Sequence, residues 1–169
     1  TIYILDTNTP SQTVSGAMLS NDTGSSNSDF ITNVASQTIT ASLSAGLNSD
    51  PMTGSADILK ISLDGGTSWN DITSKVSGLA VFYNLATLRS GTNSLQFRLE
   101  DAAGNIAAAT APITYTLDTT APTSNYTPTM LSTDDTGQFN NDSITNKSAI
   151  TIKATFSPAI QAAEKVFLS

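Results

Sequence analysis

The chain has 169 residues, a net charge of -7 at pH 7, and neither cysteine nor histidine. It can therefore form no disulfide and no thiolate metal site, and it lacks the usual general base and the commonest ligand of transition metals. The negative charge argues against nucleic acid or an anionic membrane as a partner, and no apolar run approaches the ~20 residues of a membrane span.

The first half of the chain predicts two strands separated by a polar connection. The first strand is expected at Thr13 to Leu19, and the turn-forming residues Asp, Gly and Ser fill the connection from Ser20 to Asn33. The second strand, Thr38 to Leu47, alternates apolar residues with Thr and Ser, which is typical of a strand with one buried face. A loop at Asn48 to Ala56 follows.

The remaining strands complete an all-β pattern. A third strand with Leu, Ile and Leu on its inner face ends in the tight turn Asp64 to Thr67, and Trp69 and Ile72 lie on the returning strand. About seven short strands without helical periodicity predict an all-β fold, an immunoglobulin-like Greek-key β-sandwich without disulfides. Further strands are predicted at Val81 to Leu88, Ser94 to Glu100 and, after a turn at Asp101 to Asn105, at Ile113 to Leu117.

The chain repeats itself at an interval of about 112 residues, which suits whole small domains joined in tandem. The sequence IYILDTNTP (Ile2 to Pro10) returns as TYTLDTTAP (Thr114 to Pro122). The connection Asp22 to Asn33 returns as Asp135 to Asn146, with Asp29 matching Asp142. We therefore expect the end of a preceding repeat at 1–6, a complete immunoglobulin-like domain at 7–118, and the first half of a second repeat at 119–169.

The half repeat lacks the strands that would cover its apolar residues Ile152, Phe156 and Leu168. We expect these residues to be truncated from a longer chain, unresolved, or completed by another molecule, because a half sandwich exposes its core.

Four motifs resemble a known family. They are the LDTTAP join, DTG followed by D-x-ITN, S-L-D-G-G-T-x-W, and the D-A-A-G-N turn. Together they resemble the bacterial Ig-like tandem repeats of giant surface adhesins, which Gram-negative bacteria export by type I secretion and use in biofilm formation and host attachment. The resemblance implies an extracellular stalk on the bacterial surface whose joins are made rigid by calcium. Asn8 and Thr9 depart from the Thr-Ala that the family usually has at the join.

The aspartates are predicted at the two poles where one domain joins the next. Strands of a sandwich alternate in direction, so the first connection and the chain exit share one pole, and the loop before Asn105 and the chain start share the other. Crowded carboxylates repel one another unless a cation neutralises them, and Ca²⁺ takes 6 to 8 oxygen ligands at roughly 2.3–2.6 Å. The alternative is that these side chains only form turns. The candidate calcium ligands are Asp6, Asp22, Asp29, Asp101, Asn105, Asp118, Asp135 and Asp142.

The segment Ser62 to Trp69 also fits the Asp-box pattern of sialidase propeller blades. It occurs once, and the only arginines are Arg89 and Arg98, so the arginine cluster of a sialidase is missing. We interpret the box as a local hairpin lock in which Asp64 forms the turn and Trp69 fills the core; the alternative is a sugar-stacking role for Trp69.

The leading functional hypothesis is a structural spacer in an extracellular bacterial adhesin, with neighbouring repeats as its partners and an unknown distal target. No catalytic triad and no glycine-rich phosphate loop is present, so we predict that the chain is not an enzyme. Two alternatives are a glycan- or protein-binding module that uses loops such as Asn48 to Ala56, and an accessory module of a secreted glycosidase.

Overall fold

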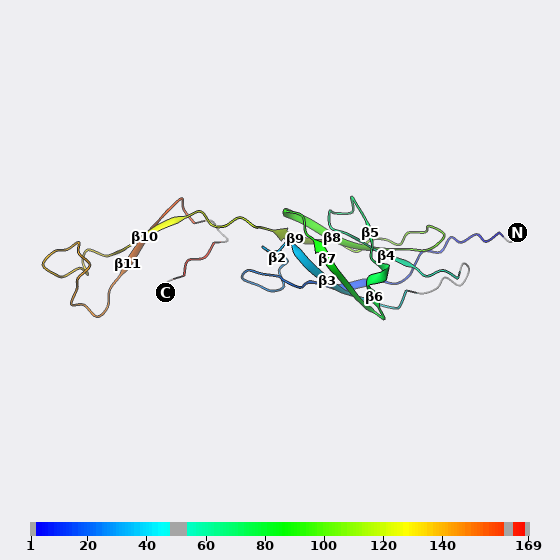
Figure 1. Ribbon diagram of the computed structural model, residues 1–169, viewed down its shortest axis with the longest axis horizontal. Coiled ribbons are helices and arrows are strands. Elements are labelled where there is room, and N and C mark those ends of the chain that lie inside the picture. The colour runs from blue at the N-terminus through cyan, green and yellow to red at the C-terminus, as the bar shows by residue number, and fades with distance from the viewer. Residues whose placement is uncertain (1–2, 48–53, 161–163, 168–169) are drawn as a thin grey trace. The chain divides into compact units, whose positions relative to one another are not determined.

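A computed structural model describes residues 3–47, 54–160 and 164–167 (Figure 1). Most of the loop predicted at Asn48 to Ala56, together with Leu168, lies outside these residues. The chain divides into two compact units, Thr1–Thr120 and Ala121–Ser169. Within the described ranges, no helix has the length and apolar character needed to cross a membrane.

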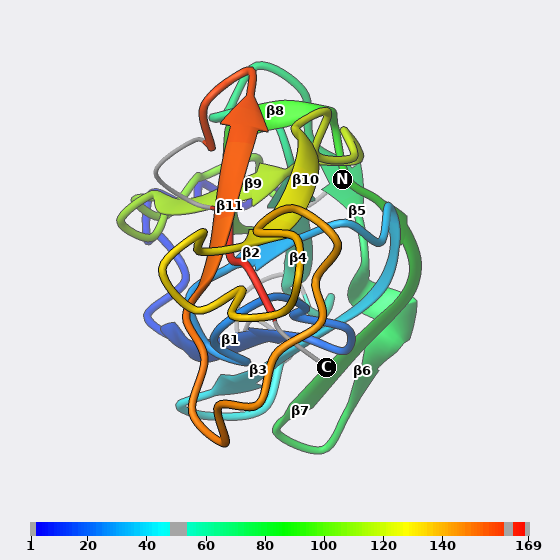
Figure 2. The same cartoon turned by 90° about the vertical axis from the view of Figure 1, so that its left-hand side faces the viewer.

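The first unit contains two sheets, which lie as separate layers when the unit is viewed end-on (Figure 2). The four-stranded sheet has the order β1-β3-β7-β6, and its neighbouring strands are all antiparallel. Its strands are β1 (Val14–Leu19), β3 (Ser36–Leu43), β7 (Ala80–Thr87) and β6 (Val76–Ser77).

The five-stranded sheet has the order β2-β9-β8-β4-β5. The pair β2 and β9 is parallel, whereas the other neighbours are antiparallel. The strands are β2 (Ile31–Thr32), β9 (Ile113–Leu117), β8 (Gly91–Glu100), β4 (Ile58–Ser62) and β5 (Asn70–Asp71). A short 3-10 helix, η1 (Thr73–Lys75), connects β5 to β6.

The core lies between the two sheets and confirms the all-β sandwich predicted from alternation. Ile39, Ile61 and Phe97 come from three different strands and are at most 1% exposed. Ile39 and Phe97 each lie between two less buried polar side chains, as a period of two requires, whereas Ser62 beside Ile61 is itself buried. The buried apolar residues are Leu19, Ile39, Ala41, Leu43, Leu59, Ile61, Leu63, Ile72, Val81, Ala86, Leu88, Leu95, Phe97, Leu99, Tyr115 and Leu117.

The prediction that Trp69 fills the core is wrong. Trp69 is only partly buried and does not belong to the core cluster. Its indole N–H donates to the carbonyl of Gly66 at 3.0 Å, which folds the ring back over the turn. Gly66 has a φ of 87°, which side chains rarely allow, and a Cβ there would lie only 3.2 Å from Gln96 Oε1. The core position on this return strand belongs to Ile72, which is 1% exposed.

The second unit contains one antiparallel pair, β10 (Asn125–Met130) and β11 (Ile152–Ser157). Ile152 is 43% exposed, whereas Ile39, its counterpart in the first repeat, is fully buried. The rings of Tyr126 and Phe156 lie 6.0 Å apart on this pair, tilted by 42°. The apolar face that the first unit buries is therefore accessible among the described residues of the second.

Candidate functional site

The connection between β1 and β3 is held by two aspartates that accept hydrogen bonds from its own backbone. Asp22 Oδ2 accepts from the N–H of Phe30 at 2.9 Å, and Asp29 Oδ1 accepts from the N–H of Ile31 at 3.0 Å. Phe30 has a φ of 61°, a conformation that non-glycine residues rarely adopt. These carboxylates therefore stabilise a strained turn just before β2.

Two threonines close the same connection. The Thr23 hydroxyl donates to Asn33 Oδ1 at 3.0 Å and accepts from the Asn33 N–H at 3.0 Å. The Thr32 hydroxyl donates to the carbonyl of Asn21 at 2.6 Å. The connection is thus a compact loop whose polar groups bond to one another.

The second unit builds the same loop from the repeated sequence. Asp135 Oδ2 accepts from the N–H of Ser143 at 3.0 Å, and Asp142 Oδ1 accepts from the N–H of Ile144 at 3.0 Å. Ser143 has a φ of 61°, the same value as its counterpart Phe30. Thr136 donates to the side chain of Asn146 at 2.8 Å. The sequence repeat is therefore a structural repeat down to individual hydrogen bonds.

One oxygen of each repeated loop has no hydrogen-bond partner. Asp22 Oδ1 and Asp135 Oδ1 are both buried, and neither contacts a donor among the described residues. Asp135 as a whole is 7% exposed. A buried carboxylate oxygen without a partner is costly, so each position favours an additional donor or a cation.

The parallel pairing of β2 with β9 brings this loop to the end of the domain where the chain leaves it. The carbonyl of Phe30 accepts from the N–H of Thr116, and the carbonyl of Thr32 accepts from the N–H of Asp118, each at 2.9 Å. The Asp118 side chain is exposed and accepts from the N–H of Thr120 at 2.9 Å. The loop and Asp118 therefore lie at the same end of the first unit.

Asp6, Asp101 and Asn105 meet at the opposite end of the first unit. Asp101 is 6% exposed, and both its oxygens accept from Asn105, one from the backbone and one from the side chain, each at 2.8 Å. Asn105 also donates to the carbonyl of Asp6 at 3.2 Å. Burial acts to raise the pKa of Asp101, but the hydrogen bonds from Asn105, Ala103 and Gly104 outweigh it and hold the pKa below its usual value.

The predicted metal ligands thus fall into separate places rather than one cluster. No three acidic side chains gather closely enough to bind an ion within residues 3–47, 54–160 and 164–167. Both oxygens of Asp101 already accept hydrogen bonds from Asn105. The buried oxygens of Asp22 and Asp135 suit a hard cation, because a carboxylate oxygen is the ligand that Ca²⁺ prefers. The fit to calcium therefore rests on these two positions.

The hairpin after β4 is locked by Asp64, as predicted for the Asp-box segment. Its carboxylate accepts from the hydroxyl of Ser62 at 2.8 Å and from the N–H and hydroxyl of Ser68 at 2.8 and 2.6 Å. Arg89 donates to it at 3.0 Å. The hydrogen bonds from Ser68, foremost, lower the pKa of Asp64 to about 2. The role of Asp64 is therefore to stabilise the hairpin turn through these hydrogen bonds.

A comparison with protein families matches residues 9–119 to a bacterial Ig-like domain. The chain belongs to the bacterial Ig-like domain family. The matched range of this bacterial Ig-like domain contains both sheets of the first unit, the loop of Asp22 and the Asp64 hairpin. No curated protein and no solved structure matched the chain. The resemblance to bacterial Ig-like repeats is thereby confirmed at the level of the domain.

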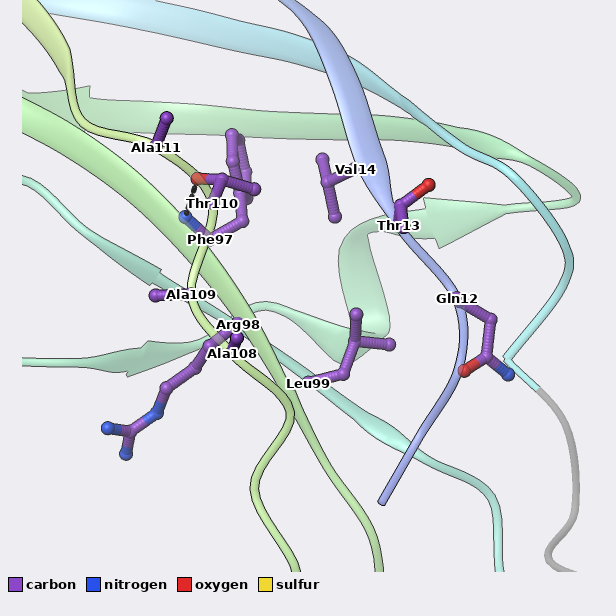
Figure 3. A pocket seen from close by; sticks show the side chains of 10 residues that line it. All are labelled: Gln12, Thr13, Val14, Phe97, Arg98, Leu99, Ala108, Ala109, Thr110 and Ala111. Atoms are coloured by element: carbon purple, nitrogen blue, oxygen red, sulfur yellow. Dashed lines mark hydrogen bonds between the residues drawn. The ribbon is translucent and has the colours of Figure 1, made fainter.

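Two buried polar residues of the bacterial Ig-like domain were missed from the sequence. Gln12 and Asp57 are each 6% exposed, and the Gln12 amide donates to Asp57 at 2.8 Å and to the carbonyl of Gly46 at 3.2 Å. Gln12 also lines a cavity of about 260 Å³ between the start of β1 and the segment 108–111, while Arg98 points away from it (Figure 3). No local motif marks either residue, because their contact spans distant parts of the chain.

Proposed function

We propose that this segment is an extracellular spacer in which bacterial Ig-like domains follow one another and hold a distal domain away from a bacterial surface. The repeated loop carries the proposal: Asp22 and Asp135 accept equivalent backbone hydrogen bonds in two successive units. A module selected for one ligand does not need its loop rebuilt bond for bond in its neighbour. Units that repeat the same loop in tandem instead suit a protein that extends over a distance.

Short turns at the joins support the same role. Asp6 accepts from the N–H of Asn8 at 3.0 Å, and Asp118 accepts from the N–H of Thr120 at 2.9 Å. Pro10 and Pro122 follow at the same distance in each copy and fix the backbone dihedral φ. The chain therefore leaves one domain and begins the next through the same stiffened turn.

Calcium at the joins is part of the proposal. Bound Ca²⁺ supplies positive charge and coordination to carboxylate oxygens that would otherwise repel one another. Asp22 and Asp135 each offer a buried oxygen without a partner, and Asp29 and Asp118 add exposed carboxylates at the same end of the first unit. These side chains hold their loops by one oxygen, which leaves the second for the ion.

The test of calcium compares the thermal unfolding of the whole chain in EDTA and in excess Ca²⁺. At a calcium concentration of ~100 times the dissociation constant, binding to the folded state alone stabilises it by roughly 2.7 kcal/mol. We expect calcium to raise the melting temperature of Asp22→Asn and of Asp135→Asn by less than it raises that of the unaltered chain. Asp71→Asn is the matched control, because Asp71 lies on β5 and its side chain likewise accepts from a backbone N–H, that of Thr73 at 2.9 Å.

If calcium raises the melting temperature of all three variants by the same amount, the aspartates only form turns.

The spacer role has a separate test, a glycan array probed with the whole chain. Strong binding that persists in EDTA would favour the binding-module alternative instead. Trp69 gives that alternative little support, since the guanidinium of Arg98 already covers its ring at 4.3 Å.

A further inference from the structure

The strands of the four-stranded sheet contain no charged residue, although the chain carries a net charge of -7. The strands of the five-stranded sheet contain four, namely Lys60, Asp71, Arg98 and Glu100. Two acidic molecules repel each other across most of their surfaces. The outer face of the four-stranded sheet is where two copies can meet without opposing like charges.

A row of larger side chains crosses this outer face. Met18 pairs with Thr40, and Thr40 pairs with Phe82, so the three lie side by side on β1, β3 and β7. Partners across a sheet point to the same face. Met18 is 59% exposed and Phe82 is 53% exposed. The row is therefore a ridge that ends in an apolar side chain at each side.

A row of small side chains runs beside the ridge. Ser15 pairs with Ser42, Ser42 with Ala80, and Ala80 with Ser77. On β3 and β7 the two rows are two residues apart, which is about 7 Å along a strand. On β1 an extra residue lies between Ser15 and Met18, and the bulge at Gly16, with a φ of 64°, keeps both on the outer face. We call this row of small side chains, which is lower than the ridge, the groove.

We propose that this face pairs with the same face of a second copy, related by a two-fold axis that runs parallel to the rows and midway between them. Such an axis places the ridge of each copy over the groove of the other. Phe82 then lies over Ala80 of the second copy, Thr40 over Ser42, and Met18 over Ser15. The pairing buries Met18 and Phe82 of both copies without burying a charge.

The pairing is specific to the first unit. The counterpart of Thr40 in the second repeat is Lys153, which puts a positive charge in the middle of the equivalent row. The two-fold axis also makes the strands of the two copies antiparallel. If the chain is a spacer as proposed above, antiparallel pairing connects spacers from opposite surfaces, so that the stalk itself supplies a contact between cells.

The experiment is sedimentation velocity of the whole chain over a range of concentrations, in EDTA, so that the result does not depend on calcium. We expect a reversible dimer that strengthens as NaCl rises from about 50 to about 500 mM, because salt screens repulsion between the remaining acidic surfaces. Thr40→Lys should raise the dissociation constant at least about tenfold, since it buries like charges. Thr114→Lys is the matched control, because Thr114 is exposed on the other sheet and the charge change is equal.

Cysteine pairs then identify the register, because the chain has no cysteine of its own. A mixture of Thr40→Cys and Ser42→Cys chains should form a mixed disulfide faster than a mixture of Thr40→Cys and Thr114→Cys chains. A chain that stays monomeric at all concentrations would overturn the proposal. So would a dimer that tolerates Thr40→Lys and is lost in Tyr126→Ser, since that contact would belong to the second unit.

Discussion

The hydroxyl of Tyr115 donates to the carbonyl of Leu63 at 2.7 Å, across 52 residues of sequence. The same oxygen accepts from the N–H of Arg89 at 3.2 Å, and the Tyr115 side chain is 1% exposed. Burial is the main reason that the pKa of Tyr115 lies above its usual value. One phenol therefore fastens β9 both to the residue that follows β4 and to the connection between β7 and β8.

Tyr115→Phe should lower the free energy of unfolding by about 1–3 kcal/mol, because it leaves the Leu63 carbonyl and the Arg89 N–H without their partner. The measurement is urea unfolding. Tyr83→Phe is the control, since Tyr83 is a partly buried tyrosine on β7 whose hydroxyl has no hydrogen bond within the described part of the chain. Equal losses in the two variants would contradict a special role for the Tyr115 hydroxyl.

Asp64→Asn should destabilise the first unit at neutral pH and cease to do so in acid. Folding lowers the pKa of Asp64 to about 2, below the unfolded value of about 4. A lowered pKa means that the carboxylate stabilises the fold above about pH 4, and that this contribution is lost as the pH falls toward 2. Thermal unfolding of both proteins between these limits provides the measurement.

The difference in stability between wild type and Asp64→Asn must depend on pH if the charge of Asp64 stabilises the hairpin. If wild type and Asp64→Asn differ by the same amount at every pH, the carboxylate charge does not stabilise the hairpin. Ser68→Ala offers a second check, because it removes the hydroxyl that donates to Asp64 at 2.6 Å. This variant should raise the pH at which the hairpin loses its stability.

Arg98→Ala should expose the single tryptophan of the chain. The Arg98 guanidinium lies 4.3 Å from the centre of the Trp69 ring and also contacts Glu100 at 2.6 Å. Its removal should increase quenching of tryptophan fluorescence by acrylamide and lower stability by about 1–2 kcal/mol. Arg89→Ala, the other arginine, should leave the quenching unchanged. Unaltered quenching in Arg98→Ala would refute the shielding of the ring.

Gln12→Glu should place a second carboxylate against the buried Asp57, at the position where the amide now donates at 2.8 Å. The pair would bind an extra proton when folded, so the loss of about 2–4 kcal/mol expected at pH 7 should shrink as the pH falls toward about 4, where both carboxyls also take up protons in the unfolded chain. Asn84→Asp, an exposed position on β7, adds the same charge without a buried neighbour. A loss no larger than in this control would show that water reaches the Gln12 site.

The sandwich was predictable because strand alternation is a local signal. Ile39, Ala41 and Leu43 occupy every second position of β3, and all three are buried. The hairpin turn was also readable, since Asp64 and the glycines after it supply both the acceptor and the positive φ that the turn needs. These features depend on residues within one turn or one strand.

Features that depend on contacts between distant residues were not predictable. The two residues of β2 lie inside what reads as a polar loop, and only their pairing with β9 makes them a strand. Trp69 was placed in the core because it is large and aromatic, whereas its indole N–H bonds to Gly66 and its ring meets Arg98. The sequence grouped the aspartates by pole, but it could not reveal that Asp101 is occupied by Asn105 or that Asp22 keeps one oxygen unpartnered.

The parallel pair of β2 and β9 gives the domain a mechanical property. Tension along the chain pulls β9 toward Asp118, while β2 stays attached to the rest of the domain through β1, which pairs with β3. Because the two strands run in the same direction, such a force slides one along the other, and the bonds of Phe30 with Thr116 and of Thr32 with Asp118 bear the load together. A ladder that must break all at once withstands more force than one that opens bond by bond, so this domain should stay folded under tension.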